Sequence, residues 1–451
     1  MLKQAVAYYH ELLKDFDLAE SSRQALDEGL EDARLIFGGR RLSPYLRPHF
    51  VTKTDWARIS GICETVWNCL QKVKDAAIEN VEILDELGIT EIEKDLVAID
   101  PKFQFVSPTA RLDSFLTENA YSFVELNGES PAGIAYADSA TEIFQSLPVM
   151  KKFREKYEIE TFEGRAKMLA VLLSCYEEFL GRKPERSPVI AIVDLKDLPT
   201  QKEFELFKDY FESQGCASLI CSPDELEFDG KSLIYKGVAI DVVYRRLLVN
   251  EYLPIIDSAP ALLQAYRAGA VCMVNSFRSK IVHKKAIFAV LTNEKYAHLF
   301  TEDELKAIKA HVPWTRKFRE EKTEFYGEEI DLVEWTRANL NKLVLKPNDD
   351  YGGHGIYIGW ASAEGEWDEA IKIALDDGDY LVQERVRTSK ETFPMLDAAG
   401  NFQMIEQLVD LDPLLFNGIV GSAFTRLSST ELANVSSGGG MVPTFIIREK
   451  E

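Results

Sequence analysis

Two pairs of polar side chains with the spacing of a β-strand could bind a cation. Arg111 and Asp113 are two residues apart, and so are Glu125 and Asn127. Side chains two apart on a strand point to the same face of the sheet. Aspartate, glutamate and asparagine offer the hard oxygen ligands that Mg²⁺ takes, and Arg111 could hold an anionic substrate group or a phosphoryl group during transfer. We interpret Asp113, Glu125 and Asn127 as candidate metal ligands.

The same residues also fit a surface hairpin. Asn127-Gly128 is a sequence typical of tight turns, and the charged side chains could simply be solvated. These residues alone do not decide between a turn and a cation site.

A glycine-rich loop within residues 342–359 could bind phosphate. An apolar strand leads to Lys346 and then to a loop that contains Gly352, Gly353 and Gly355. Glycines let backbone N–H groups approach phosphate oxygens, and Lys346 adds a positive charge. The loop lacks the Gly-Lys-Ser/Thr of a Walker A loop, and it leads into a strand rather than the helix of a dinucleotide-binding fingerprint. A plain β-hairpin with flexible glycines is the alternative.

Three more polar residues could belong to a nucleotide site. Gln383 and Glu384 end the apolar strand in DYLVQERV, and such a segment can bind adenine through its backbone and a ribose through a carboxylate. An ordinary core strand is the alternative. His354, inside the glycine-rich loop, could contact phosphate or carry a proton, or it could only cap exposed backbone.

Composition limits the class of protein. The chain has 451 residues, enough for two or three cores, and a net charge of −22. This acidity argues against nucleic acid as the main partner, because phosphate backbones need basic surfaces. The six cysteines form no Cys-x-x-Cys pair, which favours a reduced, cytoplasmic protein. The first residues read as an amphipathic helix rather than a signal peptide, and no apolar run is long enough to span a bilayer.

The elements that must position these residues change along the chain. Residues 1–100 show helical periodicity, residues 111–128 predict two short strands around a turn, and residues 137–180 return to helix. Residues 187–228 read as strand, helix and strand, which indicates a βαβ unit in a parallel sheet. Lys236-Gly237 predicts a hairpin turn, and residues 342–384 alternate strand, loop, strand, helix and strand.

These motifs together resemble the ATP-grasp ligases. Asp-x₁₁-Glu-x-Asn followed by Pro131 and Gly133 is similar to their metal-binding signature, and Lys346-Pro347 with its glycines is similar to their phosphate-covering loop. Here the Glu-x-Asn precedes the loop by more than 200 residues. That order matches the circularly permuted ATP-grasp group, and the Arg-x-Asp…Glu-x-Asn pattern resembles the synthetase domain of glutathionylspermidine synthase. No amidase domain like that of the two-domain enzyme is evident, and the glycine loop reads differently.

The resemblance implies an α/β (α+β) fold and a function. The expected fold is a circularly permuted ATP-grasp core with a Rossmann-like subdomain and a helical N-terminal region. The expected activity is an ATP- and Mg²⁺-dependent ligase that joins a carboxylic acid to an amine through an acyl phosphate. By the same resemblance, Arg111, Arg426 and Asn434 would serve the reaction end, and Lys285, Arg316 or Lys317 would supply a second ATP-binding cation. Arg245 and Arg246 could bind a carboxylate or form structural ion pairs.

The predicted division has four ranges. Residues 1–104 form the helical region, 105–150 the metal-binding part of the core, 151–275 the Rossmann-like subdomain, and 276–451 the part with the glycine-rich loop. Two other functions remain open at this point, a phosphotransferase that stops at a phosphorylated product and a nucleotide-binding scaffold without catalysis. Neither the substrates nor the oligomeric state follows from the sequence.

Overall fold

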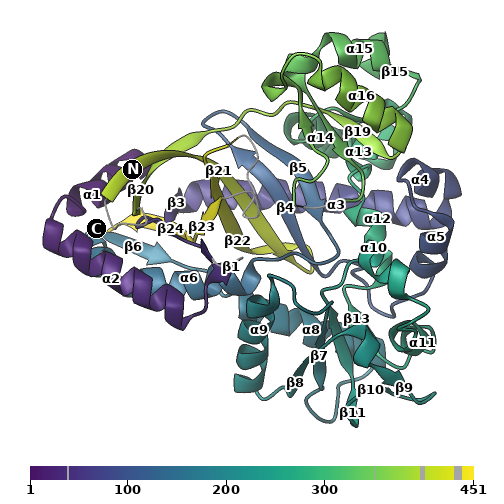
Figure 1. The fold of residues 1–451 in the computed structure, drawn as a ribbon, viewed down its shortest axis with the longest axis horizontal. Helices are drawn as coiled ribbons and strands as arrows, with labels where there is room; N and C mark the ends of the chain where they lie inside the picture. Colours follow the sequence, from purple (N-terminus) through teal and green to yellow (C-terminus); the bar gives the residue numbers. More distant parts are fainter. Residues whose placement is uncertain (38–39, 351, 397–401, 431–438, 451) are drawn as a thin grey trace.

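A six-stranded antiparallel sheet brings together segments that are far apart in the sequence (Figure 1). The computed structural model describes residues 1–37, 40–350, 352–396, 402–430 and 439–450. The strand order is β23-β22-β21-β4-β5, and β20 also pairs with β21. The strands are β4 (Thr109–Leu116), β5 (Tyr121–Asn127), β20 (Lys390–Leu396), β21 (Phe402–Phe416), β22 (Ile419–Ser428) and β23 (Gly440–Val442).

A β-bulge in β5 changes which side chains face the core. Asp113 is opposite Glu125, but Ser114 is opposite Phe123, so Val124 is an extra residue in the ladder. Tyr121, Phe123 and Leu126 therefore all pack in the core, although simple alternation would place Leu126 on the other face. Glu125 and Asn127 then point away from the core.

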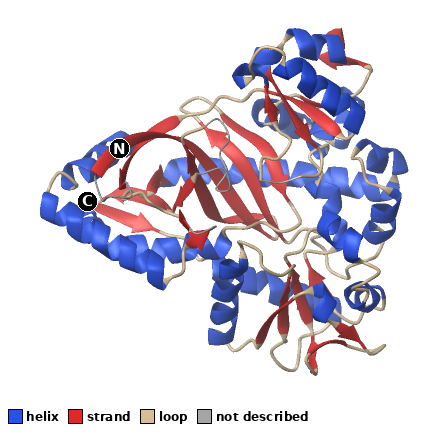
Figure 2. Cartoon of the chain, in the orientation of Figure 1, coloured by secondary structure: helices blue, strands red, loops and turns tan. Residues whose placement is uncertain are grey.

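A long helix covers the apolar face of this sheet. Helix α3 (Lys53–Glu79) begins at Thr52, whose hydroxyl accepts a hydrogen bond from the Asp55 N–H. Its buried residues recur every three or four positions, which is the period of one helix face. They pack with Leu112, Phe123 and Leu126 of the sheet. Figure 2 shows α3 as the long blue helix that crosses the red strands.

A smaller antiparallel sheet carries the glycine-rich loop. Its order is β14-β19-β17-β18, and the loop connects β17 to β18. Its inner side packs on α15 and α16 through Trp314, Leu345 and Trp367. Its elements are β14 (Thr315–Lys317), α15 (Leu332–Ala338), β17 (Leu343–Pro347), β18 (Tyr357–Ile358), α16 (Glu366–Asp377) and β19 (Tyr380–Glu384), with the hairpin β15 (Lys322–Phe325) and β16 (Glu328–Asp331) beside them.

The predicted βαβ unit is confirmed as part of a parallel sheet. Strand β7 pairs in parallel with β8 and with β12, and the order is β13-β12-β7-β8. The elements are α8 (Gly164–Leu180), β7 (Ile190–Val193), α9 (Gln201–Ser213), β8 (Ser218–Cys221), β12 (Val242–Arg245), α11 (Ala261–Arg267) and β13 (Cys272–Val274). The Lys236-Gly237 turn connects β10 (Leu233–Tyr235) to β11 (Val238–Ile240), which pair with β9 (Glu227–Phe228) as a separate small sheet.

The N-terminal region is mostly helical. Its helices are α1 (Leu2–Leu12), α2 (Phe16–Asp32), α3, α4 (Val81–Glu86) and α5 (Glu91–Val97). Three short strands interrupt them, namely β1 (Ile36–Phe37), β2 (Arg40–Arg41) and β3 (His49–Thr52). Strand β3 pairs with β24 (Thr444–Glu449), which also pairs with β6 (Tyr157–Glu160). The expectation of helix throughout residues 1–100 is therefore wrong here, because β3 finds its partner near the C-terminus.

The chain after β5 does not form the hairpin that Asn127-Gly128 suggested. Strand β5 is followed by a short loop and then by α6 (Ile134–Ser146) and α7 (Pro148–Phe153), while the hairpin turn lies between β4 and β5. Glu129 in this loop is buried and accepts a hydrogen bond from the Val249 N–H at 2.8 Å. Within the described part of the chain, no helix is long and apolar enough to cross a membrane.

A buried ion pair connects the loop after β5 to the parallel sheet, and its loss should destabilise the fold. Arg245 lies 3.3 Å from Glu129, and both side chains are fully buried. Removing one partner of such a pair costs about 3 kcal/mol, because the other charge is left without compensation. We expect Glu129→Gln to lower the free energy of unfolding by this amount in chemical denaturation followed by fluorescence. Glu11→Gln, which breaks an exposed pair with Lys14, should leave the curve unchanged. Equal curves for both variants would contradict the prediction.

Candidate nucleotide and metal site

One face of the large sheet carries a row of charged and amide side chains. Arg111 is paired across the strands with Asn127, and Asp113 with Glu125. The bulge at Val124 is what brings Glu125 and Asn127 to this face rather than to the core. The structure therefore brings the four residues of the sequence motif together, as the strand spacing predicts.

Asp113 is the centre of the hydrogen bonding on this face. Arg111 Nε donates to its Oδ1 at 2.8 Å, Asn127 Nδ2 donates to the same oxygen at 2.9 Å, and Arg426 Nη2 donates to its Oδ2 at 2.6 Å. Burial would raise the pKa of Asp113, but the two guanidinium groups outweigh burial and hold the pKa at about 2. Asp113 is therefore a carboxylate at neutral pH. Asn127 keeps its amide oxygen for another contact, because its nitrogen makes this bond.

Two further carboxyl groups lie beside Asp113, and sequence reasoning missed them. Ligand oxygens of Asp113, Asp410 and Asp412 all lie within 4.8 Å of one another, and all three residues are buried. Burial raises the pKa of both Asp410 and Asp412, although Arg426 opposes this shift. The alternation Asp-x-Asp in the apolar strand QLVDLDPLLF was the available signal, since two charges on one face of a buried strand need a reason. Arg426, proposed from the sequence, stands among them.

Lys346 connects the two sheets. Its ammonium group donates to the Val124 carbonyl of β5 at 2.7 Å and to Gln383 Oε1 of β19 at 2.8 Å. The carbonyl belongs to the bulge residue, which the ladder leaves without a cross-strand partner. Burial lowers the pKa of Lys346 to about 7, although Glu125 nearby favours the charged form. Lys346 and Glu125 therefore face the same space from opposite sheets.

Among the three candidates for a second cation, Lys285 reaches this space. Its ammonium lies 3.6 Å from Glu125 Oε1 and donates to the Asp350 carbonyl at the start of the glycine-rich loop. Arg316 faces the other side of the small sheet, since it is paired with Val382 of the small core and donates to the carbonyl of Thr292 at 3.0 Å. Lys317 pairs with Asp379 at 3.5 Å.

The glycine-rich loop begins directly after β17. Gly352, Gly353 and Gly355 have φ angles of 70°, 80° and 67°, which are unfavourable for other residues. A Cβ at Gly355 would also lie 2.7 Å from the Tyr380 hydroxyl. The conformation of the loop backbone thus favours glycine at all three positions, between two strands that pair antiparallel. His354 is exposed.

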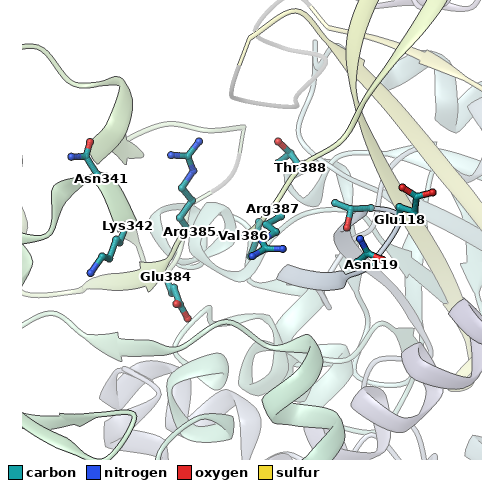
Figure 3. Close-up of a pocket in the computed structure, with 10 residues that line it drawn as sticks. Glu118, Asn119, Asn341, Lys342, Glu384, Arg385, Val386, Arg387 and Thr388 are labelled. Atoms are coloured by element: carbon teal, nitrogen blue, oxygen red, sulfur yellow. The ribbon is translucent and has the colours of Figure 1, made fainter.

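Gln383 and Glu384 lie on opposite faces of β19. Gln383 bonds Lys346 and also donates to Thr315 Oγ1 at 3.0 Å, so it faces the large sheet. Glu384 accepts a hydrogen bond from the Tyr326 hydroxyl at 2.6 Å and lines a cleft of about 630 Å³. The cleft lies between the β4–β5 turn at 117–119, residues 341–342, and the connection at 384–388 (Figure 3). The cleft therefore lies about 13 Å along the strand direction from Asp113, which is the length of the four residues from Asp113 to Thr117.

Arg245 and Arg246 fall outside this site. Arg245 and Arg246 form the structural ion pairs that were one of their two alternatives, with Glu129 and Glu203 at 3.3 Å each. Asn434 lies outside the described residues.

The donor groups suit a metal ion bound with a polyphosphate. Asp113, Glu125 and Asn127 place three oxygen-bearing side chains on one sheet face, which is the ligand chemistry of Mg²⁺. Lys285, Lys346 and the loop backbone approach from the other side, which is the chemistry that holds phosphate oxygens. The two cations would lie on one side of a bound phosphate chain, with the carboxylates and arginines on the other.

Comparison with known proteins agrees with this architecture. Residues 116–426 match the family described as circularly permuted ATP-grasp type 2. A Frankia alni protein named as a glutamate–cysteine ligase is 30% identical over 222 residues, covering 46% of this chain and 24% of that protein. Another from Frankia casuarinae, similarly named, is 23% identical and covers 73% of this chain and 37% of its own length. The chain thus spans about a quarter of the length of the Frankia alni protein and somewhat over a third of the length of the Frankia casuarinae protein.

A solved structure shows the same fold. A glutathione synthetase-like effector from Globodera pallida, in its apo form, superposes with a TM-score of 0.59 at 14% identity. The superposition covers 95% of this chain and 96% of that one. The circularly permuted ATP-grasp fold expected from the sequence is therefore confirmed.

The lowered pKa of Lys346 predicts how stability changes with pH. The unfolded lysine has a pKa near 10.5 and the folded one about 7, so the unfolded state binds more protons between these values. The free energy of unfolding should therefore rise with pH across this window, by at most about 1.4 kcal/mol per pH unit. Lys346→Met should lack this contribution. In denaturant titrations, the free energy of unfolding of wild type should therefore rise relative to that of the variant from pH 7 to pH 9. A constant difference would show that Lys346 stays charged.

Proposed function

Since the chain belongs to the circularly permuted ATP-grasp type 2 family, we propose that it is an ATP- and Mg²⁺-dependent ligase that joins a carboxylic acid to an amine. The observation that carries the proposal is the meeting of two oppositely charged surfaces. Beside the glycine-rich loop, Lys285 Nζ lies 3.6 Å from Glu125 Oε1, and Lys346 Nζ donates to the carbonyl of the neighbouring Val124 at 2.7 Å. A metal-bound triphosphate has the charge pattern that would fit between them.

The chain's own residues have separate tasks in this proposal. Asp113, Glu125 and Asn127 would hold Mg²⁺, which neutralises phosphate charge and orients the transferred phosphoryl group. Lys285, Lys346 and the amides of Gly352, Gly353 and Gly355 would bind the phosphate oxygens, with His354 at the loop surface. Gln383, which faces Lys346, and Glu384, at the cleft between the β4–β5 turn and the 384–388 connection, would border the base and ribose.

The arginines would act at the reacting groups. Arg111 and Arg426 lie on the large sheet and both donate to Asp113. A guanidinium group binds a carboxylate or a phosphoryl group through a fixed pair of donors. We assign them to the acid substrate and to the phosphoryl group as it moves. Asn434 would complete this end, as the family resemblance implies.

The proposed reaction is the one that the family resemblance implies. The substrate carboxylate attacks the γ-phosphorus, the bond to the ADP oxygen breaks, and an acyl phosphate forms. The amine then attacks the acyl carbon, loses a proton, and displaces phosphate to give an amide. The protein contributes chiefly by positioning the reactants and neutralising charge, as in other phosphoryl transfers.

The names of the relatives favour an amino acid as a substrate. Two of them are named as glutamate–cysteine ligases, a name that describes the joining of two amino acids. An activity like that of glutathionylspermidine synthase is another form of the same amide chemistry. Two different functions remain to be distinguished by experiment, a phosphotransferase that releases the phosphorylated acid and a binding scaffold without turnover.

The metal ligands provide the first test. We expect Glu125→Gln and Asn127→Ala to lower ATP turnover on the order of 100-fold, because each removes a ligand oxygen from the proposed metal site. Turnover is measured as ADP release with Mg²⁺ over a panel of amino acids in pairs. Glu227→Gln, an exposed change on β9, is the matched control and should behave as wild type. Unchanged turnover in Glu125→Gln would contradict the proposal, and absence of ATP binding by wild type in calorimetry would exclude it.

The requirement for an amine provides the second test. A ligase should release phosphate only when both acid and amine are present, since the acyl phosphate stays bound until it is attacked. Hydroxylamine, a small neutral nucleophile, should intercept the acyl phosphate and yield a hydroxamate with the acid alone. Steady release of an acyl phosphate without any nucleophile would instead identify a phosphotransferase.

A further inference from the structure

A short segment of the N-terminal helical region touches the base of the glycine-rich loop. Residues 86–93 comprise the end of α4, the connection at 87–90 and the start of α5. The Leu87 carbonyl accepts a hydrogen bond from Asn348 Nδ2 at 2.9 Å, and Glu93 lies 3.3 Å from Lys284 Nζ. Glu86 also pairs with Arg319 of the small subdomain at 3.2 Å. This segment lies upstream of the residues 116–426 that match the family.

Asn348, which makes the first of these contacts, and its neighbour Asp349 are both held by further hydrogen bonds. Asn348 is fully buried, and its Oδ1 accepts from the Ala286 N–H at 2.8 Å. Asp349 accepts from Lys280 at 2.6 Å and from Lys284 at 2.8 Å. They stand directly before the glycine-rich loop, so the loop begins from a fixed base.

The same base fixes the position of Lys285. The Lys285 N–H donates to the Asn348 carbonyl at 3.0 Å, and its ammonium donates to the Asp350 carbonyl. Any shift of residues 348–350 would therefore move both the loop and the cation that faces Glu125. The contacts join residues 280–286, 348–350 and 86–93 into one unit.

Buried charge makes this unit depend on Glu93. Lys280 and Lys284 are buried, and their anionic partners are Asp349, Glu129 and Glu93. Glu93 is 3% exposed and also accepts from the Thr90 N–H at 2.9 Å, which fixes its direction at the start of α5. Without Glu93, Lys284 would keep Asp349 as its carboxylate partner among the described residues, and a buried ammonium group is costly when its charge is less well compensated.

Gly88 lets the segment approach this closely. Its φ angle is +73°, and a Cβ there would lie 2.6 Å from Asn348 Nδ2 and 2.8 Å from Asp379 Oδ1. A side chain at this position would push on the residue that starts the loop. Gly181 has a similar φ of +65°, but a Cβ there would meet no atom within 4 Å, so it shares the backbone cost without the contact.

We propose that residues 86–93 are a positioning element of the nucleotide site, which holds the glycine-rich loop and Lys285 in place for phosphate binding. The N-terminal helical region thereby has a role in nucleotide affinity, although none of its residues would touch the nucleotide. This inference rests on the proposed function, because it assumes that the loop and Lys285 bind ATP.

The glycine pair gives the primary test, using the full chain and the affinity for ATP with Mg²⁺ in calorimetry. Gly88→Ala should weaken ATP binding tenfold or more, and Gly181→Ala should change it less than twofold. Both variants should lower the midpoint of thermal unfolding, since both place alanine at a positive φ, and Gly88→Ala should lower it more because its Cβ also meets Asn348. Equal ATP affinities for the two folded variants would overturn the proposal.

A second pair keeps the test decisive if Gly88→Ala does not fold. Glu93→Gln preserves shape and removes the charge beside Lys284, and it should weaken ATP binding about fivefold or more. Glu391→Gln, which removes the carboxylate partner of the buried Arg47 elsewhere, should leave ATP affinity unchanged. Wild-type affinity in Glu93→Gln would overturn this inference and leave the proposed function intact. Failure of wild type itself to bind ATP would overturn both.

Discussion

The ammonium group of Lys346 holds the two sheets of the site in register with each other. A buried lysine needs hydrogen-bond acceptors, and this one finds them on both sides, at the Val124 carbonyl of β5 and at Gln383 of β19. The metal-binding face and the glycine-rich loop belong to different sheets, so their relative position depends on contacts of this kind. Lys285 adds a second connection, from the start of the loop to Glu125.

Several charges of the site are compensated before any ligand binds, and Lys346 differs because its acceptors are a carbonyl and an amide oxygen. Arg111 and Arg426 neutralise Asp113 on the large sheet, while Glu125 lies close to Lys285. A bound metal ion would take the place of Lys285 beside Glu125, and the phosphate chain would take the place of Glu125 beside Lys285. Little new charge would then be buried on binding, which limits the desolvation cost.

Much of this site could be predicted from the sequence, because its key residues have local signatures. Spacing of two on a strand placed Arg111 with Asp113 and Glu125 with Asn127, and clustered glycines after Lys346 indicated the loop. The resemblance to the permuted family supplied the fold, which periodicity alone would not. Asp410 and Asp412 were missed because their relevance comes from lying beside Asp113, a contact across nearly 300 residues of sequence.

The choice among the candidate cations also needed the structure. Lys285, Arg316 and Lys317 are all cationic side chains, so the sequence does not rank them. The pairing of β14 with β19 shows that Arg316 faces the small core. Strand β3 was read as helix because its partner β24 lies at the other end of the chain. In both cases the deciding interaction is long-range. The division into four sequence ranges stays a prediction.

The bulge at Val124 reverses the alternation of side chains along β5. Upstream of the bulge, odd-numbered side chains such as Phe123 face the core, and downstream of it they face the site. Loss of Val124 would restore plain alternation with Leu126 still in the core and Glu125 and Asn127 still facing the site, but it would remove the carbonyl that accepts from Lys346. Conservative replacements at Val124 can be accommodated, since its main contribution is a backbone carbonyl. Loss or gain of one residue between Glu125 and Asn127, by contrast, would shift the alternation and move a candidate ligand to the core face.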